Sequence, residues 1–141
     1  MSKEMRLHIG CGDNIIGGYI NVDIRNRPGV NVVCDISEKL PFPSDTADEV
    51  LAIDVLEHIR PGKIAGVIAE IYRVLKPGCF MVAEVPNIRM QAKVWLETNS
   101  SADTEWFSRA VYGDQGYPEN THYLLFDEPR LKILSINAGF K

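Results

Sequence analysis

The stretch Leu7-His8-Ile9-Gly10-Cys11-Gly12 decides the fold, because a short apolar strand runs directly into a turn that contains two glycines. Glycine has no Cβ, so the backbone of such a turn can bend sharply and approach a ligand closely. A second short strand, residues 19–22, ends at Asp23 with little room for a helix before it. A carboxylate at that place can accept both hydroxyl hydrogens of a ribose. Each feature alone also fits an ordinary turn or helix cap. The two therefore indicate a nucleotide site only if the ends of further strands also carry ligand-binding groups.

Three more strands are expected downstream, at residues 30–34, 49–53 and 80–85. Apolar residues recur at helical spacing over 64–75, and Lys76-Pro77-Gly78 supplies a helix stop. Strands that alternate with helices or loops predict an α/β fold with a doubly wound, mostly parallel five-stranded sheet and right-handed crossovers. In such sheets ligands bind outside the carboxyl ends of the strands, so the residues just after each strand are the candidates for a site.

Beyond the fifth expected strand the pattern weakens. Residues 87–126 show one helix at about 90–96, followed by aromatic and glycine-containing sequence, and we expect this segment to form a lid or substrate loop. A last helix is expected from the cap at Asp127 to the stop at Gly139. The length of 141 residues predicts a single domain over residues 1–141.

Charge and composition exclude several classes. The formal net charge of -4 and the pI near 5.3 argue against a nucleic-acid partner. The three cysteines, Cys11, Cys34 and Cys79, are far apart, and neither they nor the three histidines show metal-ligand spacing, so no metal site and no disulfide framework is expected. No signal peptide or membrane span is evident, and a reducing cytoplasm is the expected location.

A third strand end carries another polar group. Asp35 follows the strand at residues 30–34, and Ile36 comes next. An aspartate there can receive an adenine amino group while the aliphatic side chain packs on the ring. Three strand ends that each carry the needed group favour a nucleotide site over three unrelated turns.

At this point the chain resembles the class I S-adenosylmethionine-dependent methyltransferases, specifically the small type 11-like ones. The motifs that carry the resemblance occur in order over roughly residues 5–87. They are Leu7-His8-Ile9-Gly10-Cys11-Gly12, Gly18-Tyr19-Ile20-Asn21-Val22-Asp23, Cys34-Asp35-Ile36, Leu40-Pro41-Phe42-Pro43, Asp54-Val55-Leu56-Glu57-His58 and Arg73-Val74-Leu75-Lys76-Pro77-Gly78. A weaker similarity continues through Tyr112-Gly113-Asp114-Gln115, His122, Phe126-Asp127 and Ala138-Gly139-Phe140.

The resemblance implies a Rossmann-like methyltransferase core that uses S-adenosylmethionine. The net charge of -4 favours a small-molecule or sugar-type methyl acceptor over a nucleic acid. The residues that it implies for cofactor binding are Gly10, Cys11, Gly12, Asp23, Ile24, Asp35, Ile36 and Asp54. For a hydroxyl or amine acceptor, His122 is the leading candidate for the catalytic base and Asp54 the second. His122 could equally be a loop residue that hydrogen-bonds the backbone, and Glu57 and His58 could simply orient a turn.

The chain also departs from the family pattern. His8 stands where an acidic residue is usual, and the third glycine of the loop is absent, with Asp13-Asn14 in its place. The family fold normally continues after a segment like Ala138-Gly139-Phe140 into an antiparallel strand pair, so the sequence looks truncated. An unprotected fifth strand would then be able to pair with a second copy, which predicts a homodimer.

Two rival functions remain open. A non-catalytic protein that binds S-adenosylmethionine, or a partner, on a degenerate methyltransferase fold would explain the departures. A nicotinamide-dependent dehydrogenase explains Gly10, Gly12 and Asp23 but lacks the G-x-G-x-x-G spacing.

Overall fold

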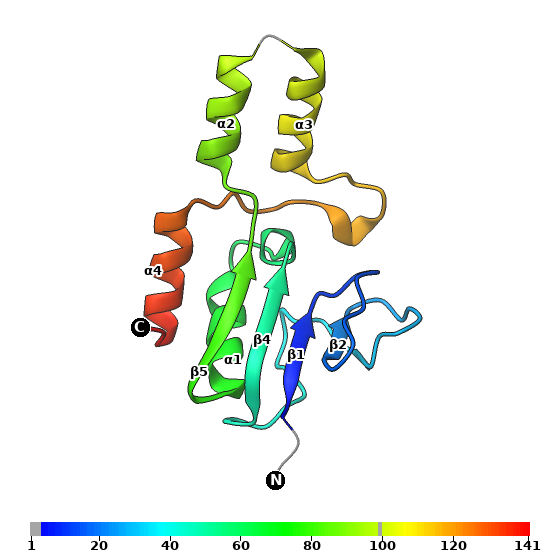
Figure 1. Ribbon diagram of the computed structural model, residues 1–141, viewed down its shortest axis with the longest axis vertical. Coiled ribbons are helices and arrows are strands. Elements are labelled where there is room, and N and C mark those ends of the chain that lie inside the picture. Colours follow the sequence, from blue (N-terminus) through cyan, green and yellow to red (C-terminus); the bar gives the residue numbers. More distant parts are fainter. Residues whose placement is uncertain (1–3, 99) are drawn as a thin grey trace.

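The computed structural model describes residues 4–98 and 100–141. Its sheet contains β1 (Arg6–Ile9), β2 (Ile20–Asp23), β3 (Val32–Val33), β4 (Ala47–Ile53) and β5 (Leu75–Glu84). All neighbours pair in parallel in the order β3-β2-β1-β4-β5. The helices are α1 (Ile64–Val74), α2 (Ile88–Glu97), α3 (Ser101–Tyr112) and α4 (Glu128–Ala138), with 3-10 turns η1 (Leu56–His58) and η2 (Pro118–Asn120). The predicted α/β class with a five-stranded parallel sheet is confirmed (Figure 1).

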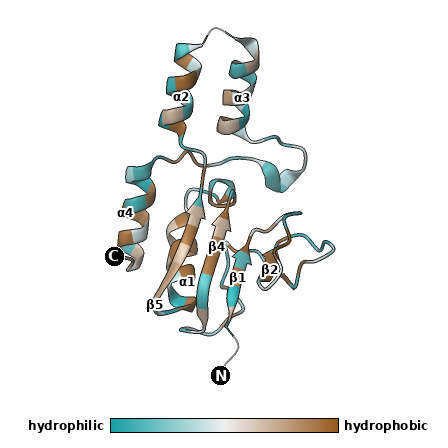
Figure 2. Cartoon of the chain, in the orientation of Figure 1, coloured by the Kyte–Doolittle hydropathy of each residue, from teal (hydrophilic) through white to brown (hydrophobic). Residues whose placement is uncertain are grey.

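One face of the sheet forms the hydrophobic core. Leu7, Ile9, Val50 and Ala52 are fully buried on that face, and the register places them side by side across β1 and β4. The apolar stripe of α1 is buried in the same core, as its helical spacing predicted. Burial of each side chain of this size stabilises the fold by about 1.5–3 kcal/mol. Figure 2 shows the hydrophobic residues along β4 and α1.

The other face carries buried polar groups next to the glycine turn. His8 and Asn21 are paired in register and buried, and His8 Nδ1 lies 3.3 Å from Asn21 Oδ1. The Asn21 amide oxygen also accepts the Ile16 N–H at 3.1 Å, and its amide nitrogen donates to the Ile16 carbonyl at 3.1 Å. The unusual His8 therefore belongs to a hydrogen-bonded network that fastens the loop between β1 and β2 onto the sheet.

The strand boundaries differ from prediction at two places. The third strand is only Val32–Val33 instead of residues 30–34. The fifth strand starts at Leu75, so Lys76-Pro77-Gly78 lies inside it and not in a turn before it. A register shift between Ala47 and Glu49 and the left-handed backbone of Gly78, with φ 83°, accommodate the irregular stretch.

The expectation that the sequence after residue 97 is irregular was wrong, because α3 occupies residues 101–112. Neither α2 nor α3 has a buried residue, so no core-facing stripe marks α3 in the sequence. The two helices contact each other: the Trp95 and Phe107 rings stack at 5.0 Å, and Trp95 Nε1 donates to the Thr104 hydroxyl at 3.0 Å. Figure 1 shows this pair beyond the carboxyl ends of the strands.

The segment 87–126 ends in the core. Leu124 and Phe126 are buried, and the Ile88 N–H donates to the Phe126 carbonyl at 2.9 Å. The lid role of the segment stays a prediction. So does self-association, although β5 is an edge strand and exposes Phe80 and Val82. None of the helices in the described ranges is long and apolar enough to cross a membrane.

Candidate nucleotide site

The turn after β1 needs glycine at Gly10. Its backbone has φ 63°, a left-handed conformation that costs other residues energy, and an added Cβ would lie 2.0 Å from Val55 Cγ2. Gly12 also has positive φ, but the nearest atom to an added Cβ is the Arg25 guanidinium at 3.7 Å. Gly10 thus permits close packing against Val55, whereas Gly12 keeps the pocket side of the turn open.

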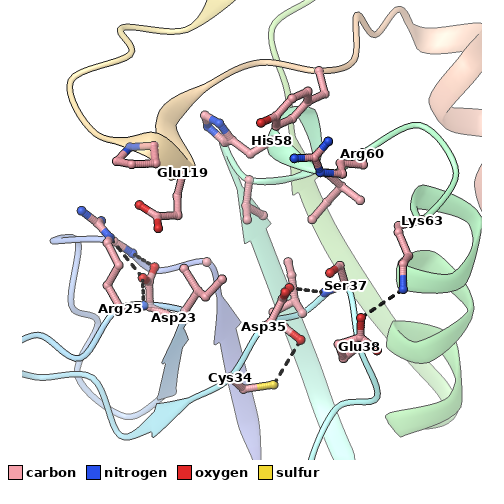
Figure 3. Close-up of a pocket in the computed structure, with 18 of the residues that line it drawn as sticks. Asp23, Arg25, Cys34, Asp35, Ser37, Glu38, His58, Arg60, Lys63 and Glu119 are labelled. Carbon is pink, nitrogen blue, oxygen red and sulfur yellow. Dashed lines mark hydrogen bonds and ion pairs between the residues drawn. The ribbon is translucent and has the colours of Figure 1, made fainter.

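Asp23 ties the turn to the end of β2. Its carboxylate accepts the Gly12 N–H at 2.8 Å and the Arg25 N–H at 2.9 Å. The Arg25 side chain also approaches this carboxylate, with Nε 3.4 Å from Oδ1, and its guanidinium lies 4.0 Å over the Tyr117 ring. Figure 3 shows Asp23 and Arg25 side by side on one wall of the pocket. The carboxylate is held in one orientation before any ligand binds.

These groups line a pocket of about 540 Å³ at the carboxyl ends of the strands. That volume is in the range of small-molecule and cofactor sites. Seven of the predicted cofactor-binding residues line it, namely Gly10, Gly12, Asp23, Ile24, Asp35, Ile36 and Asp54. Cys11 does not: its side chain is buried, and its N–H donates to the Val22 carbonyl at 3.0 Å, so it helps shape the turn.

Asp35 and Ile36 form the wall after β3. The Asp35 carboxylate accepts the Ser37 N–H at 2.8 Å, which orients it toward the pocket, and Ile36 is buried beneath it. At the rim, Lys63 donates to Glu38 at 3.0 Å (Figure 3). An apolar floor with a fixed acceptor at its edge suits a flat, hydrogen-bonding ring.

Asp54 follows β4 in an unusual backbone conformation. Its φ is 47°, which places a non-glycine residue in the left-handed region, while its N–H donates to the Glu84 carbonyl at 3.0 Å. Such conformations cluster at functional sites, because they aim a side chain where regular backbone could not. Asp54 lines the pocket together with Gly10 and Gly12 of the turn after β1 and His58 of η1.

Glu57, His58 and His122 form a cluster that the sequence did not predict. The His58 and His122 rings meet edge to face at 4.7 Å, and His122 Nε2 lies 4.0 Å from Glu57 Oε1. His58 lines the pocket, whereas His122 is not among the lining residues and contacts the His58 ring. The adjacent Glu57 and His58 are a visible signal in the sequence, but their link to His122, 64 residues after His58, depends on the tertiary fold.

Burial dominates the chemistry of this cluster. Loss of solvation raises the pKa of the Glu57 carboxyl to about 7, and the nearby Asp54 and Glu84 carboxylates act in the same direction. Burial likewise lowers the pKa of His58, although its bond to the Thr121 carbonyl opposes the shift. One Glu57 oxygen, Oε2, is buried and has no hydrogen-bond partner among the described residues.

The segment after α3 closes the cluster. The Glu57 carbonyl accepts the N–H groups of Tyr123 at 2.8 Å and of Leu124 at 3.1 Å. These two bonds hold His122 beside η1. The same segment contributes to the pocket, because Tyr123 lines it and the Arg60 guanidinium lies over the Tyr123 ring at 5.0 Å.

Comparisons with known proteins agree with this fold. A family model described as a methyltransferase domain matches residues 17–83. No curated protein sequence matches the chain. Among solved structures, a SAM-dependent methyltransferase from Archaeoglobus fulgidus superposes with a TM-score of 0.68 at 21% identity, and the match covers 98% of this chain and 61% of that one.

Two further structures are similar. A possible histamine N-methyltransferase from Thermotoga maritima has a TM-score of 0.67 at 19% identity, over 100% of this chain and 66% of that one. The 1,6-didemethyltoxoflavin-N1-methyltransferase of Burkholderia thailandensis, solved with 1,6-didemethyltoxoflavin and S-adenosylhomocysteine, has a TM-score of 0.62 at 18% identity, over 95% and 59%. The chain thus spans about three-fifths of the length of these relatives. By its match to the methyltransferase-domain model over residues 17–83 and by its fold, the chain is similar to the S-adenosylmethionine-dependent methyltransferases and shares their α/β architecture.

Proposed function

We propose that this chain binds S-adenosylmethionine in the pocket at the strand ends and transfers its methyl group to a small-molecule acceptor. The observation that carries the proposal is the convergence of Gly12, Asp23, Asp35 and Asp54 from four separate strand ends on one pocket. The Burkholderia relative, which was solved with S-adenosylhomocysteine, supports the choice of cofactor.

The residues fit that cofactor in kind. Asp23 offers a carboxylate that is already oriented by two backbone N–H groups, which suits the hydroxyls of a ribose. Asp35 and Ile36 offer an acceptor and an apolar surface for adenine. The open side of the turn at Gly12 leaves room for the methionine part. Ile24 completes the wall beside Asp23.

The cofactor supplies an activated methyl group on a sulfonium that leaves as a thioether, so the protein needs mainly to align and enclose the reactants. Asp54 is the residue we expect to face both reactants, and its place in the pocket lining supports this role. His122 remains a candidate base, and its contact with the pocket runs through the His58 ring. A small acceptor fits the net charge of -4 better than a nucleic acid does.

The experiment is an acceptor screen. Purified protein is incubated with S-adenosylmethionine and a collection of small hydroxyl and amine compounds, and formation of S-adenosylhomocysteine is measured. We expect product that depends on one acceptor class, and a loss of roughly a hundredfold in kcat for Asp54→Asn. Asp45→Asn is the matched control, because Asp45 has a similar left-handed backbone, with φ 57°, but is exposed and lies outside the pocket lining.

Cofactor binding without turnover on any acceptor would instead favour the non-catalytic binding protein. Equal kcat values for Asp54→Asn and the wild type would remove Asp54 from the mechanism.

A further inference from the structure

Both histidines beside Glu57 have one ring nitrogen committed to the backbone. His58 Nδ1 lies 3.1 Å from the Thr121 carbonyl oxygen, and His122 Nδ1 lies 2.8 Å from the Ala110 carbonyl oxygen. A carbonyl oxygen only accepts hydrogen bonds, so Nδ1 carries the hydrogen in each ring. In the neutral rings, therefore, both Nε2 atoms carry a free lone pair.

This arrangement is the one that metal-binding histidines show. A ligating imidazole almost always donates its second nitrogen to a carbonyl or carboxylate, which sets the tautomer and the ring orientation. The two carbonyls come from α3 and from the segment after η2, so the tertiary fold orients both rings in advance.

Glu57 adds an anionic ligand to the pair. Its side chain is almost fully buried, and Oε2 has no hydrogen-bond partner among the described residues. A buried carboxylate oxygen without a partner is costly, and a cation would satisfy it. One ligand atom from each of Glu57, His58 and His122 lies within 4.8 Å of the other two.

We propose that Glu57, His58 and His122 form a binding site for a first-row divalent transition metal ion of the zinc type, contrary to the expectation that the chain has no metal site. Zinc-bound nitrogen and oxygen atoms lie about 2.0–2.2 Å from the ion, which places ligand atoms roughly 3.4 Å apart in a tetrahedron. The three groups therefore need to draw together by about 1 Å.

The donor set also indicates which ions would bind. Two imidazoles and one carboxylate suit Zn²⁺, Co²⁺ or Fe²⁺, whereas Mg²⁺ and Ca²⁺ prefer sites made of oxygen ligands. Three protein ligands leave at least one coordination position open, as in catalytic zinc sites.

The position of the cluster gives such an ion a role, and this role rests on the proposed function. His58 belongs both to the cluster and to the pocket wall. An ion bound there would coordinate the hydroxyl oxygen of the methyl acceptor and lower the pKa of that hydroxyl group. The acceptor would then be a hydroxyl compound, with the proton released to water and the methyl group transferred to the remaining oxygen.

The test uses metal alone, so that its outcome is independent of cofactor binding. Metal-free protein is titrated with Co²⁺, whose visible absorption becomes intense in four- or five-coordinate sites. We expect one equivalent to bind, to be displaced by Zn²⁺ and to resist Mg²⁺. Glu57→Gln should bind at least tenfold more weakly. Glu128→Gln is the control, because it makes the same change on the exposed first turn of α4.

A second measurement keeps the proposal testable if Glu57→Gln fails to fold. In wild-type protein labelled with ¹⁵N, Zn²⁺ should shift the Nε2 resonances of His58 and His122. The resonances of the third histidine, His8, should stay, because its ring is hydrogen-bonded to Asn21 and is not part of the cluster. A cobalt spectrum like that of the aqueous ion, unchanged affinity in Glu57→Gln, or unshifted histidine resonances would each overturn the proposal.

Discussion

Replacing Asp23 with alanine is expected to weaken binding of S-adenosylhomocysteine by at least about a hundredfold. Two hydrogen bonds from ribose hydroxyls to a carboxylate contribute about 1.5–3 kcal/mol each, and 2.7 kcal/mol already corresponds to roughly a hundredfold in affinity. The variant also removes the acceptor of the Gly12 and Arg25 N–H groups, so the turn loses its fixed shape. Isothermal titration of the two proteins measures the difference.

Asp13→Ala is the matched control for this variant. Asp13 lies in the same loop and forms an ion pair with Arg27 at 3.3 Å, but its side chain is 73% exposed. Removing it changes the charge of the protein equally and leaves the pocket lining intact. An Asp23→Ala protein that binds within threefold of the Asp13→Ala control would show that the ribose is not held there.

Gly10→Ala is expected to lower the free energy of unfolding by about 3 kcal/mol. The left-handed backbone costs alanine about 1–2 kcal/mol, and overpacking in a filled core adds about 1–3 kcal/mol. The overpacking arises because the new Cβ would lie 2.0 Å from Val55 Cγ2. Urea denaturation followed by circular dichroism measures the change in midpoint.

Gly17→Ala separates this effect from a general effect of losing glycine. An added Cβ at Gly17 has nothing within 4 Å, and its φ lies outside the left-handed region. It should therefore change stability by less than about 1 kcal/mol. Equal midpoints for the two alanine variants would mean that the turn after β1 is not packed against Val55 as described.

The sequence predicts the sheet and the pocket well, because both depend on local signals. Short apolar strands that end in Gly10, Asp23, Asp35 and Asp54 mark the strand ends directly, and parallel strands bring those ends to one edge. The sequence predicted a turn at Lys76-Pro77-Gly78, but these residues lie inside β5, which starts at Leu75. An edge strand such as β5 can contain a proline.

Contacts between distant segments could not be predicted in the same way. The helix α3 has no buried stripe, because its partner is the equally exposed α2. The role of Glu57 depends on burial by a segment that returns to η1 more than sixty residues later, and on carbonyls of Ala110 and Thr121 that orient two rings. Hydrophobic periodicity predicts helices and strands, and it does not predict which distant side chains come into contact.

The most direct test of the central claim is a crystal structure of the chain with S-adenosylhomocysteine. The account predicts ribose hydroxyls on the Asp23 carboxylate, adenine against Ile36 with its amino group toward Asp35, and the sulfur near Asp54. Density for the ligand elsewhere on the molecule, or a pocket that stays empty at saturating ligand, would contradict it and leave a methyltransferase fold with another use.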